Sequence, residues 1–174
     1  MIWQNIIDLV NLANERCGIR TCSDAVFYEG NLMTAIVFDL DGTLIDSVGD
    51  IHAALTQMLV RAGHDPLGRD IVTSFLGKGS SNLVRRVLNL AGLPCEAASH
   101  TNYLTEFLDI YTSEPAKFTT VFDQVHEVLR DFQSSGIALG LCTNKPQSAT
   151  NVVLEEFGLT AFFGSIVGGD RLPS

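Results

Sequence analysis

Two carboxylates stand two residues apart, directly after a short apolar run. Asp39 and Asp41 follow Ala35–Phe38, whose β-branched residues favour a buried parallel strand. In an extended strand the side chains of residues i and i+2 point to the same side, so these two negative charges would repel each other unless a cation lay between them. A plain strand followed by an Asp-Gly turn is the alternative, but it does not explain why a carboxylate interrupts the apolar run. The pair therefore predicts a site for a metal ion and a phosphate.

The two residues that follow the pair are suited to the same site. Gly42 ends the strand and lets the backbone approach a ligand closely, because it has no side chain. Thr43 adds a hydroxyl group at the same rim. We expect both residues to bind substrate.

A second polar cluster follows another apolar run. Residues 137–142 predict a buried strand, and Thr143, Asn144 and Lys145 come directly after it, before Pro146. Ligands of open α/β sheets bind at the carboxyl ends of the strands, where both clusters would lie. Taken alone, the second cluster is a routine turn from a strand into a helix that starts near the proline. We interpret Lys145 as solvent-facing or as a residue at the rim of the substrate site.

The two clusters together resemble the first and second motifs of the haloacid dehalogenase-like hydrolase superfamily, in its phosphatase form. The segments that carry the resemblance are FDLDGTLIDS and CTNKP. The resemblance implies that Asp39 is a nucleophile that forms an aspartyl-phosphate and that Asp41 is a general acid and base. It implies that Thr143, as a catalytic residue, and Asn144 bind the phosphorylated substrate. It also implies that the Asp39 carboxylate and the Asp41 backbone carbonyl hold Mg²⁺.

The resemblance also implies a substrate class, a small phosphorylated metabolite. The phosphoglycolate phosphatases of the superfamily resemble the whole pattern most closely, so we expect a phosphomonoesterase with 2-phosphoglycolate as the favoured substrate. Pyrophosphatases, sugar-phosphate phosphatases and phosphomutases share much of the pattern and are kept as alternatives.

The end of the sequence departs from the superfamily's pattern. Residues 168–173 resemble the segment that leads to a third motif, but the lysine of that motif and a fourth, acidic motif would lie after Ser174. Asp170 matches the segment before that lysine and is not assigned as a metal ligand. We therefore expect residues 1–174 alone to be inactive, and an inactive truncated remnant or a binding module is the alternative to an enzyme. Because the superfamily places the fourth-motif strand beside the first, we also expect an unpaired edge along residues 35–40.

Between the two clusters, residues 48–113 predict an inserted helical cap. Apolar residues recur there at helical spacing, with glycines where helices would end. The expected apolar faces are Ile51, Leu55, Met58, Leu59 and Ala62; Leu83, Val84, Val87, Leu88 and Ala91; and Tyr103, Leu104, Phe107, Leu108 and Tyr111.

A glycine-rich loop lies between two of these predicted helices. We expect Gly77, Lys78 and Gly79 to help bind the substrate, with the lysine suited to a small anion. An ordinary loop with a solvated lysine fits the pattern almost as well. Arg85 and Arg86 on the next helix are either binding groups for a substrate carboxylate or solvated surface charges.

Residues 33–47 and 114–174 predict the α/β core that carries both clusters. Alternating strands and helices indicate a doubly wound, Rossmann-like parallel sheet with right-handed crossovers, incomplete in this chain. The expected helix faces are Val125, Val128, Leu129 and Phe132, and Val152, Val153 and Phe157; the expected strands include residues 137–142 and Ser165–Val167.

Residues 1–32 lie outside the resemblance. Residues 2–14 have the spacing of an amphipathic helix, and residues 19–31 have no clear period. A partner-binding helix is one interpretation. The favoured one is a start codon placed too far upstream, because Glu29-Gly30 can be encoded by a purine-rich run shortly before Met33.

Composition narrows the class of protein. The chain has 174 residues, a net charge of −9 and a pI of about 4.7, which disfavour nucleic acid and anionic membranes as partners. Its four cysteines have no metal-ligand spacing, so reduced thiols are expected. No apolar stretch has the length of a membrane span, and no signal peptide is recognisable. We expect a cytoplasmic protein, of undetermined oligomeric state.

Overall fold

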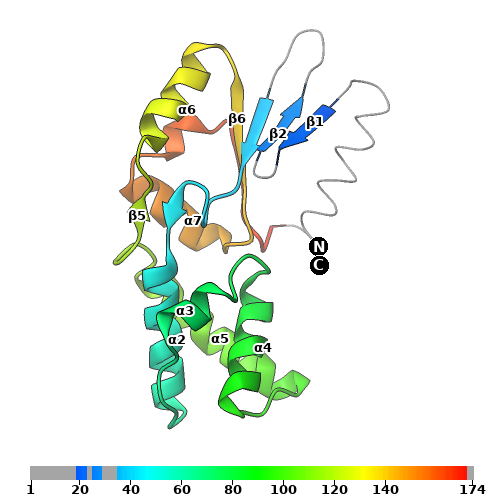
Figure 1. Cartoon of the computed structure of the whole chain (residues 1–174), viewed down its shortest axis with the longest axis vertical. Coiled ribbons are helices and arrows are strands. Elements are labelled where there is room, and N and C mark those ends of the chain that lie inside the picture. Colours follow the sequence, from blue (N-terminus) through cyan, green and yellow to red (C-terminus); the bar gives the residue numbers. More distant parts are fainter. Residues whose placement is uncertain (1–18, 23–24, 29–34, 172–174) are drawn as a thin grey trace. The chain divides into compact units, whose positions relative to one another are not determined.

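The structure is a computed structural model that describes residues 19–22, 25–28 and 35–171. It divides into two compact units, an α/β unit within Met1–Ile45 and Val121–Ser174 and a helical unit, Asp46–Thr120. Figure 1 shows the elements of both units. The predicted α/β class is confirmed, whereas the predicted domain boundaries, with the cap at residues 48–113, stay a prediction.

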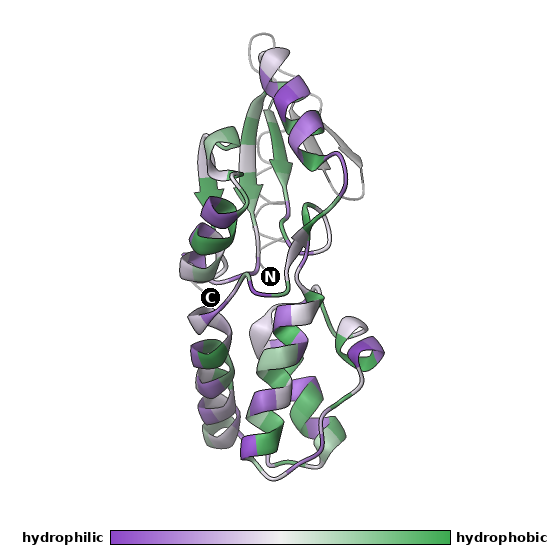
Figure 2. Cartoon of the chain, turned by 90° about the vertical axis from the view of Figure 1, so that its left-hand side faces the viewer, coloured by the Kyte–Doolittle hydropathy of each residue, from purple (hydrophilic) through white to green (hydrophobic). Residues whose placement is uncertain are grey.

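A five-stranded sheet with the order β1-β2-β3-β6-β7 forms the centre of the α/β unit. The strands β3, β6 and β7 are parallel, as expected for strands that alternate with helices. Figure 2 shows β3 and β6 as mostly hydrophobic, which suits strands in the middle of a sheet. The bounds are β1 (Ile19–Cys22), β2 (Ala25–Tyr28), β3 (Ala35–Phe38), β6 (Ala138–Cys142) and β7 (Ser165–Val167).

Strand β2 pairs with the edge of β3 that we expected from the sequence to be unpaired. The two strands are antiparallel, with Val26 opposite Val37 and Phe27 opposite Ile36, and β2 in turn pairs with β1. The expectation of an unpaired edge is therefore wrong for β3. Two four-residue strands are too short to show an alternating pattern, so the period of the sequence did not predict them. The predicted helix at residues 2–14 lies outside the described residues.

Two helices and an aromatic cluster cover the sheet. The Phe38 ring lies 6.2 Å from that of Phe132 and 6.4 Å from that of Phe163, measured between ring centroids. Val128 and Val152, expected on the apolar faces, are 43% and 47% exposed, because the helices turn neighbouring residues toward the core instead. The elements are α6 (Val125–Ser134), α7 (Gln147–Glu156) and the 3₁₀ helix η1 (Thr160–Phe162).

Four helices form the helical unit: α2 (Val48–Arg61), α3 (Arg69–Thr73), α4 (Ser80–Ala91) and α5 (Ala97–Ser113). Helices α2 and α4 both pack against α5. The predicted faces supply the core, with Met58, Leu88 and Phe107 almost completely buried. Gly92 ends α4 in the left-handed conformation, as its position predicted. Within the described ranges, no helix has the length and apolar character needed to cross a bilayer.

A buried carboxylate ties the segment after α5 to the start of α2. Asp50 accepts a 2.9 Å hydrogen bond from the Phe118 amide and a 2.6 Å bond from the Thr119 hydroxyl. This clasp explains why the helical unit extends beyond Ser113, to Thr120. The short strands β4 (Ile45–Asp46) and β5 (Thr120–Val121) form a separate two-stranded sheet.

A close contact between two loops fixes the turn after β6. The Gly169 amide donates to the Lys145 carbonyl at 2.9 Å, and the Asp170 carboxylate accepts from the Gln147 amide at 2.8 Å. A Cβ on Gly169 would lie 2.5 Å from the Asn144 carbonyl oxygen, which no real contact allows. The approach therefore requires glycine. We call this contact the glycine latch, formed by residues 168–170 against residues 144–147.

The glycine latch predicts opposite outcomes for two Gly→Ala variants of the α/β unit. Gly169→Ala should lower the free energy of unfolding by about 1–3 kcal/mol, the usual cost of forcing an extra group into packed structure. Gly164→Ala is the matched control, because its Cβ would meet only the Leu139 carbonyl oxygen at 3.8 Å, an ordinary contact. Urea denaturation of both variants measures the difference. Equal stability of the two would contradict the latch.

The pairing of β2 with β3 predicts slow hydrogen exchange along both edges of β3. The amides of Ile36, Val37 and Phe38 point alternately to β2 and to β6, so all should be protected. Removing residues 1–32 should accelerate exchange at the amides that face β2 only. Mass spectrometry or NMR gives the rates. Fast exchange on one edge of β3 in the intact chain would argue against the hairpin.

Candidate active site at the carboxyl ends of β3 and β6

The parallel pairing of β3 and β6 brings the two predicted clusters together. Phe38 lies opposite Leu141 in the register, so Asp39 and Thr143 follow neighbouring strands at the same edge of the sheet. The Asp39 carboxylate accepts a 2.7 Å bond from the Leu40 amide and a further bond from the Thr143 hydroxyl. Thr143 is held in turn by its amide, which donates to the Val167 carbonyl at 3.0 Å.

A tight turn places Asp41 beyond the end of β3. The Leu40 carbonyl accepts from the amides of Leu44 and Ile45, at 2.9 and 3.2 Å, and the Gly42 amide donates to the Ile45 carbonyl at 2.8 Å. Gly42 has φ +83°, a conformation that few other residues adopt, so its glycine is needed for the turn itself. Thr43 is half-buried at the same turn. The proposed substrate contacts of Gly42 and Thr43 stay predictions.

The structure places Lys145 elsewhere than the sequence led us to expect. Its side chain is only 1% exposed, and its Nζ lies 2.9 Å from Asp41 Oδ1. The interpretation of Lys145 as solvent-facing is therefore wrong, since the ammonium turns inward and forms an ion pair with a predicted catalytic carboxylate, whereas its place at the rim of a substrate site stays a prediction. One signal was present: Thr143 and Lys145 are spaced i, i+2, like Asp39 and Asp41, so the two strand ends present matching pairs.

The electrostatics of the site favour keeping a proton or a cation at Asp39. Burial raises the pKa of the Asp39 carboxyl group, and the negative charge of Asp41 raises it further. The Leu40 amide, the Thr143 hydroxyl and the Lys145 ammonium act in the opposite direction and lower that pKa. Burial, followed by the charge of Asp39, also raises the pKa of the Cys142 thiol, which makes this cysteine a poor nucleophile.

The donor atoms at this edge fit Mg²⁺. Asp39 and Asp41 supply hard oxygen ligands, and Mg²⁺ is commonly bound by one or two carboxylates together with water and a substrate phosphate. In the part of the chain that the structure describes, no three His, Cys, Asp or Glu side chains gather as a larger metal cluster. Asp170 accepts a 2.8 Å hydrogen bond from the Gln147 amide, and its not being a metal ligand stays a prediction.

The other predicted binding residues lie in two places. Asn144 is half-buried next to Thr143, in the α/β unit. Gly77, Lys78 and Gly79 belong to the helical unit, where they connect α3 to α4; both glycines have positive φ, and the lysine is exposed. Their contact with a substrate stays a prediction.

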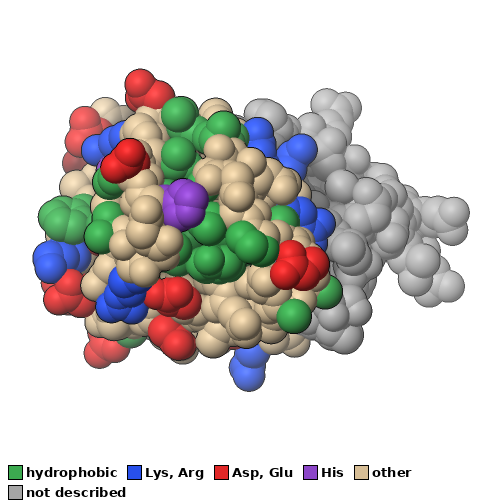
Figure 3. Space-filling model, turned by 90° about the horizontal axis from the view of Figure 1, so that it is seen from below, with side chains coloured by type: hydrophobic (Ala, Val, Ile, Leu, Met, Phe, Trp, Pro, Cys, Tyr) green, Lys and Arg blue, Asp and Glu red, His purple; other side chains and the backbone are tan. Residues whose placement is uncertain are grey.

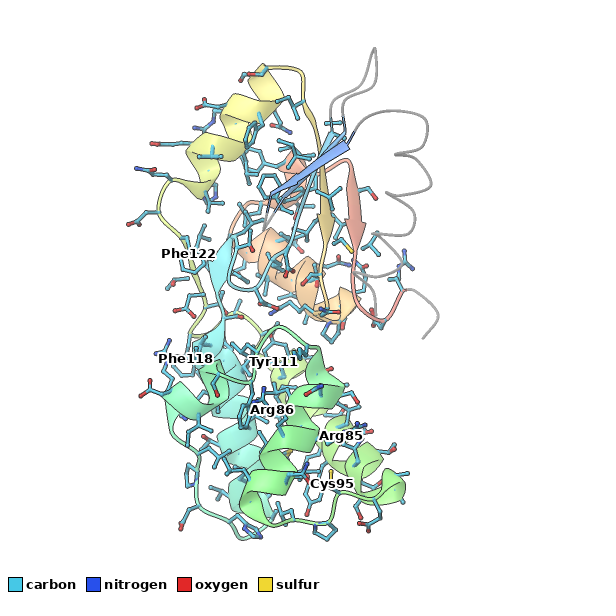
Figure 4. The ribbon with its side chains drawn as sticks, turned by 45° about the vertical axis from the view of Figure 1, so that its right-hand side comes forward. Arg85, Arg86, Cys95, Tyr111, Phe118 and Phe122 are labelled. Atoms are coloured by element: carbon cyan, nitrogen blue, oxygen red, sulfur yellow. The ribbon has the colours of Figure 1, made fainter. Side chains whose placement is uncertain are left out.

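The two arginines of α4 are surface residues of the helical unit (Figure 4). The Arg86 guanidinium lies 3.9 Å above the centroid of the Phe75 ring, and its Nη1 donates to the Ser74 carbonyl at 3.3 Å. Arg86 thus braces the segment that leads into the glycine-rich loop. On the face seen in Figure 3, basic side chains are interspersed with acidic and hydrophobic ones, which gives this face no continuous basic patch for nucleic acid.

The raised pKa of Asp39 predicts a pH-dependent stability difference. The folded protein holds the Asp39 proton up to a higher pH than the unfolded chain does, so stability is lost as pH rises from about 3.8 through the folded-state pKa. Asp39→Asn removes this loss, because an amide does not ionise. At pH 7 the variant should be more stable than the wild type by about 1.4 kcal/mol for each unit by which the Asp39 pKa of the folded protein exceeds that of the unfolded chain.

Urea denaturation of both proteins between pH 4 and 7.5, in metal-free buffer, measures this difference. The exposed Asp123→Asn serves as the control. A gap between wild type and Asp39→Asn that does not widen with pH would contradict the argument.

Comparison with known proteins gives relatives along most of the chain. A phosphoglycolate phosphatase of Cereibacter sphaeroides is 39% identical over 141 residues, which cover 81% of this chain and 65% of the relative. A phosphoglycolate phosphatase of Pseudomonas putida is 37% identical over 148 residues, which cover 84% of this chain and 54% of the relative. The chain therefore spans between about half and two thirds of the length of these relatives.

Solved structures share the fold. A predicted phosphoglycolate phosphatase from Haemophilus somnus has a TM-score of 0.73 at 25% identity, over 79% of this chain and 63% of its own. A putative phosphoglycolate phosphatase from Lactobacillus delbrueckii has a TM-score of 0.69 at 22% identity, over 76% and 63%, a similarity of fold alone. The model of one protein family matches residues 36–174, which contain every candidate site residue. By that match, the chain belongs to the haloacid dehalogenase-like hydrolase family.

Proposed function

We propose that the protein is a metal-dependent phosphatase that hydrolyses a small phosphomonoester through a phosphorylated Asp39. One observation carries this proposal: Asp39, Asp41 and Thr143 meet at the carboxyl ends of two adjacent parallel strands, with a buried lysine beside them. Family membership and relatives named as phosphatases support the same chemistry.

In the first half of the proposed reaction, an Asp39 carboxylate oxygen attacks the phosphorus atom. A new oxygen–phosphorus bond forms as the bond to the alcohol oxygen breaks, and Asp41 gives its proton to that oxygen. The Thr143 hydroxyl and nearby backbone amides orient the phosphoryl oxygens. Asp39 is suited to attack because the Leu40 amide already orients its carboxylate.

In the second half, water attacks the phosphorus atom of the aspartyl-phosphate. Asp41 takes a proton from that water, the Asp39–phosphate bond breaks, and inorganic phosphate leaves. The Asp39 carboxylate and the Asp41 carbonyl would hold Mg²⁺, which when bound neutralises charge on the phosphoryl oxygens. Asp41 is partly exposed, with 28% of its side chain accessible, so leaving group and water can both reach it.

For the substrate we propose 2-phosphoglycolate, because relatives at 39% and 37% identity are named phosphoglycolate phosphatases. Gly77, Lys78 and Gly79 would help select it, the lysine by attracting an anion. Asn144, Gly42 and Thr43 would contact it from the α/β unit. We propose the cytoplasm as the compartment, which fits the free thiols of Cys95 and Cys142.

The proposal is tested by assaying the purified full-length protein, not residues 1–174 alone, against a panel of phosphate esters. The panel contains 2-phosphoglycolate, sugar phosphates, pyrophosphate and p-nitrophenyl phosphate, with release of inorganic phosphate as the readout. Asp39→Asn should abolish both turnover and acid-trapped phosphoenzyme, because an amide cannot form the acyl phosphate. Asp41→Asn should lower turnover by about 10²–10⁴-fold, the usual loss when general acid–base catalysis is removed.

Metal depletion belongs to the same experiment. Activity should vanish in chelator and return with Mg²⁺, whereas Ca²⁺ should inhibit because its longer bonds and higher coordination number disturb the geometry of attack. Turnover by Asp39→Asn at the wild-type rate, or full activity without metal, would contradict the proposed mechanism. Binding of phosphate esters without any turnover would instead favour a binding module.

A further inference from the structure

Lys145 is buried to a degree that lysine rarely reaches. Its side chain is 1% exposed, whereas lysines almost never lie fully inside a protein unless they are paired. An ammonium group removed from water loses several kcal/mol of hydration, which only a well-placed partner can offset. The 2.9 Å contact with Asp41 provides such a partner.

The other ion pairs among the described residues differ from this one in exposure. Arg61–Glu106 and Arg69–Asp46 are 3.5 Å apart, and Lys117–Glu114 is 2.8 Å apart; in each pair, both side chains are at least one-third exposed. Exposed pairs contribute about 0–1 kcal/mol and let their side chains reorient in water. In the Lys145–Asp41 pair the lysine is buried and the carboxylate is 28% exposed, so the ammonium has little room to reorient in water.

The backbone of Lys145 is anchored on both sides. Its amide donates to the Thr143 hydroxyl at 3.3 Å, and its carbonyl accepts from the Gly169 amide through the glycine latch. The backbone from which the lysine side chain extends is therefore fixed between the end of β6 and the loop that follows β7. Burial of that side chain leaves its ammonium little freedom to move away from Asp41.

The Lys145 ammonium is a partner suited to the position of Asp41. Asp39 accepts from the Leu40 amide at the strand end, and Asp41 stands beyond that end, on the tight turn that includes Gly42. The negative charge of Asp39 tends to push the Asp41 carboxylate away. The Lys145 ammonium opposes that repulsion and holds Asp41 Oδ1.

We infer that Lys145 is a positioning residue, which holds the Asp41 carboxylate where it can exchange a proton with the leaving group and with the attacking water. The inference rests on the proposed function and deepens it, because it assigns a role to a residue that acts through Asp41. A lysine that bound the substrate phosphate directly would act without Asp41, and this difference makes the two roles separable.

The test combines Lys145→Met with Asp41→Asn in a double-mutant cycle on an alkyl phosphomonoester. Lys145→Met should lower kcat by about 10–100-fold, in the range of coupling between contacting residues, and should add little once Asp41 is already Asn. KM and inhibition by inorganic phosphate should change little, because Lys145 does not hold the phosphate. Lys145→Arg, which keeps the charge, should restore part of kcat.

A pre-steady-state measurement with p-nitrophenyl phosphate separates positioning from a structural defect. Nitrophenolate leaves without a proton, so the burst that reports Asp39 phosphorylation should keep its rate in Lys145→Met. The slower turnover that follows, which needs Asp41 as a base, should fall. General disruption of the site would slow both phases.

Two further variants distinguish a loss of positioning from misfolding. Lys117→Met is the matched control, since it removes a lysine from an exposed lysine–carboxylate pair in the helical unit and should leave kcat unchanged. Lys145→Gln keeps a hydrogen-bond donor in the buried site and should show the same kcat loss with a native thermal transition, even where Lys145→Met unfolds.

The outcomes are distinguishable. If the wild type is active and the kcat losses from Lys145→Gln and Asp41→Asn multiply, the inference alone is overturned. The same holds if Lys145→Gln leaves kcat unchanged or raises the inhibition constant for phosphate. A full-length wild-type protein that forms no phosphoenzyme contradicts the proposed function, and the inference with it. If the kcat losses from the two variants do not multiply and the burst keeps its rate, the result supports both the inference and the proposed function.

Discussion

Two like charges at the end of one strand are the constraint on which this site depends. Asp39 and Asp41 follow β3 at i and i+2, and burial already disfavours ionisation of Asp39. The structure supplies the compensating charge from the neighbouring strand, as the buried ammonium of Lys145. A metal ion would add further positive charge at the same edge. The architecture of the α/β unit can be understood as the means of placing that lysine.

To place Lys145, the backbone at residues 168–169 must approach the backbone at residues 144–147 more closely than a Cβ atom would permit. Gly169 lies against the Asn144 carbonyl and Gly168 against Gln147, at distances that exclude a Cβ. The same approach lets Asp170 accept from the first amide of α7, where unpaired backbone donors are concentrated. The glycine latch therefore stabilises the helix and fixes the loop that carries Thr143 and Lys145. Stability and site geometry share one set of contacts.

The helical unit follows a separate logic. Its core is a set of interlocking apolar faces, and its link to the chain after α5 is the Asp50 clasp with Phe118 and Thr119. The segment that leads into its glycine-rich loop is braced by Arg86 above Phe75. Polar groups here maintain the shape of connections between helices, whereas in the α/β unit they gather at the strand ends.

The local features of this protein can be predicted from short segments of its sequence. Asp39, Asp41 and Thr143 were recognisable because short motifs bind their ligands with adjacent residues, and the helices of the inserted unit were recognisable because a 3.6-residue period and glycine stops are properties of a single segment. Tertiary structure decided what depends on segments far apart in the chain. Lys145 forms a buried ion pair with Asp41, which lies 104 positions earlier in the chain, and β3 has a second neighbour because a hairpin without visible period pairs with it. Val128 and Val152 point outward although their helices were correctly predicted, since the direction of a helix face is set by the sheet on which it packs.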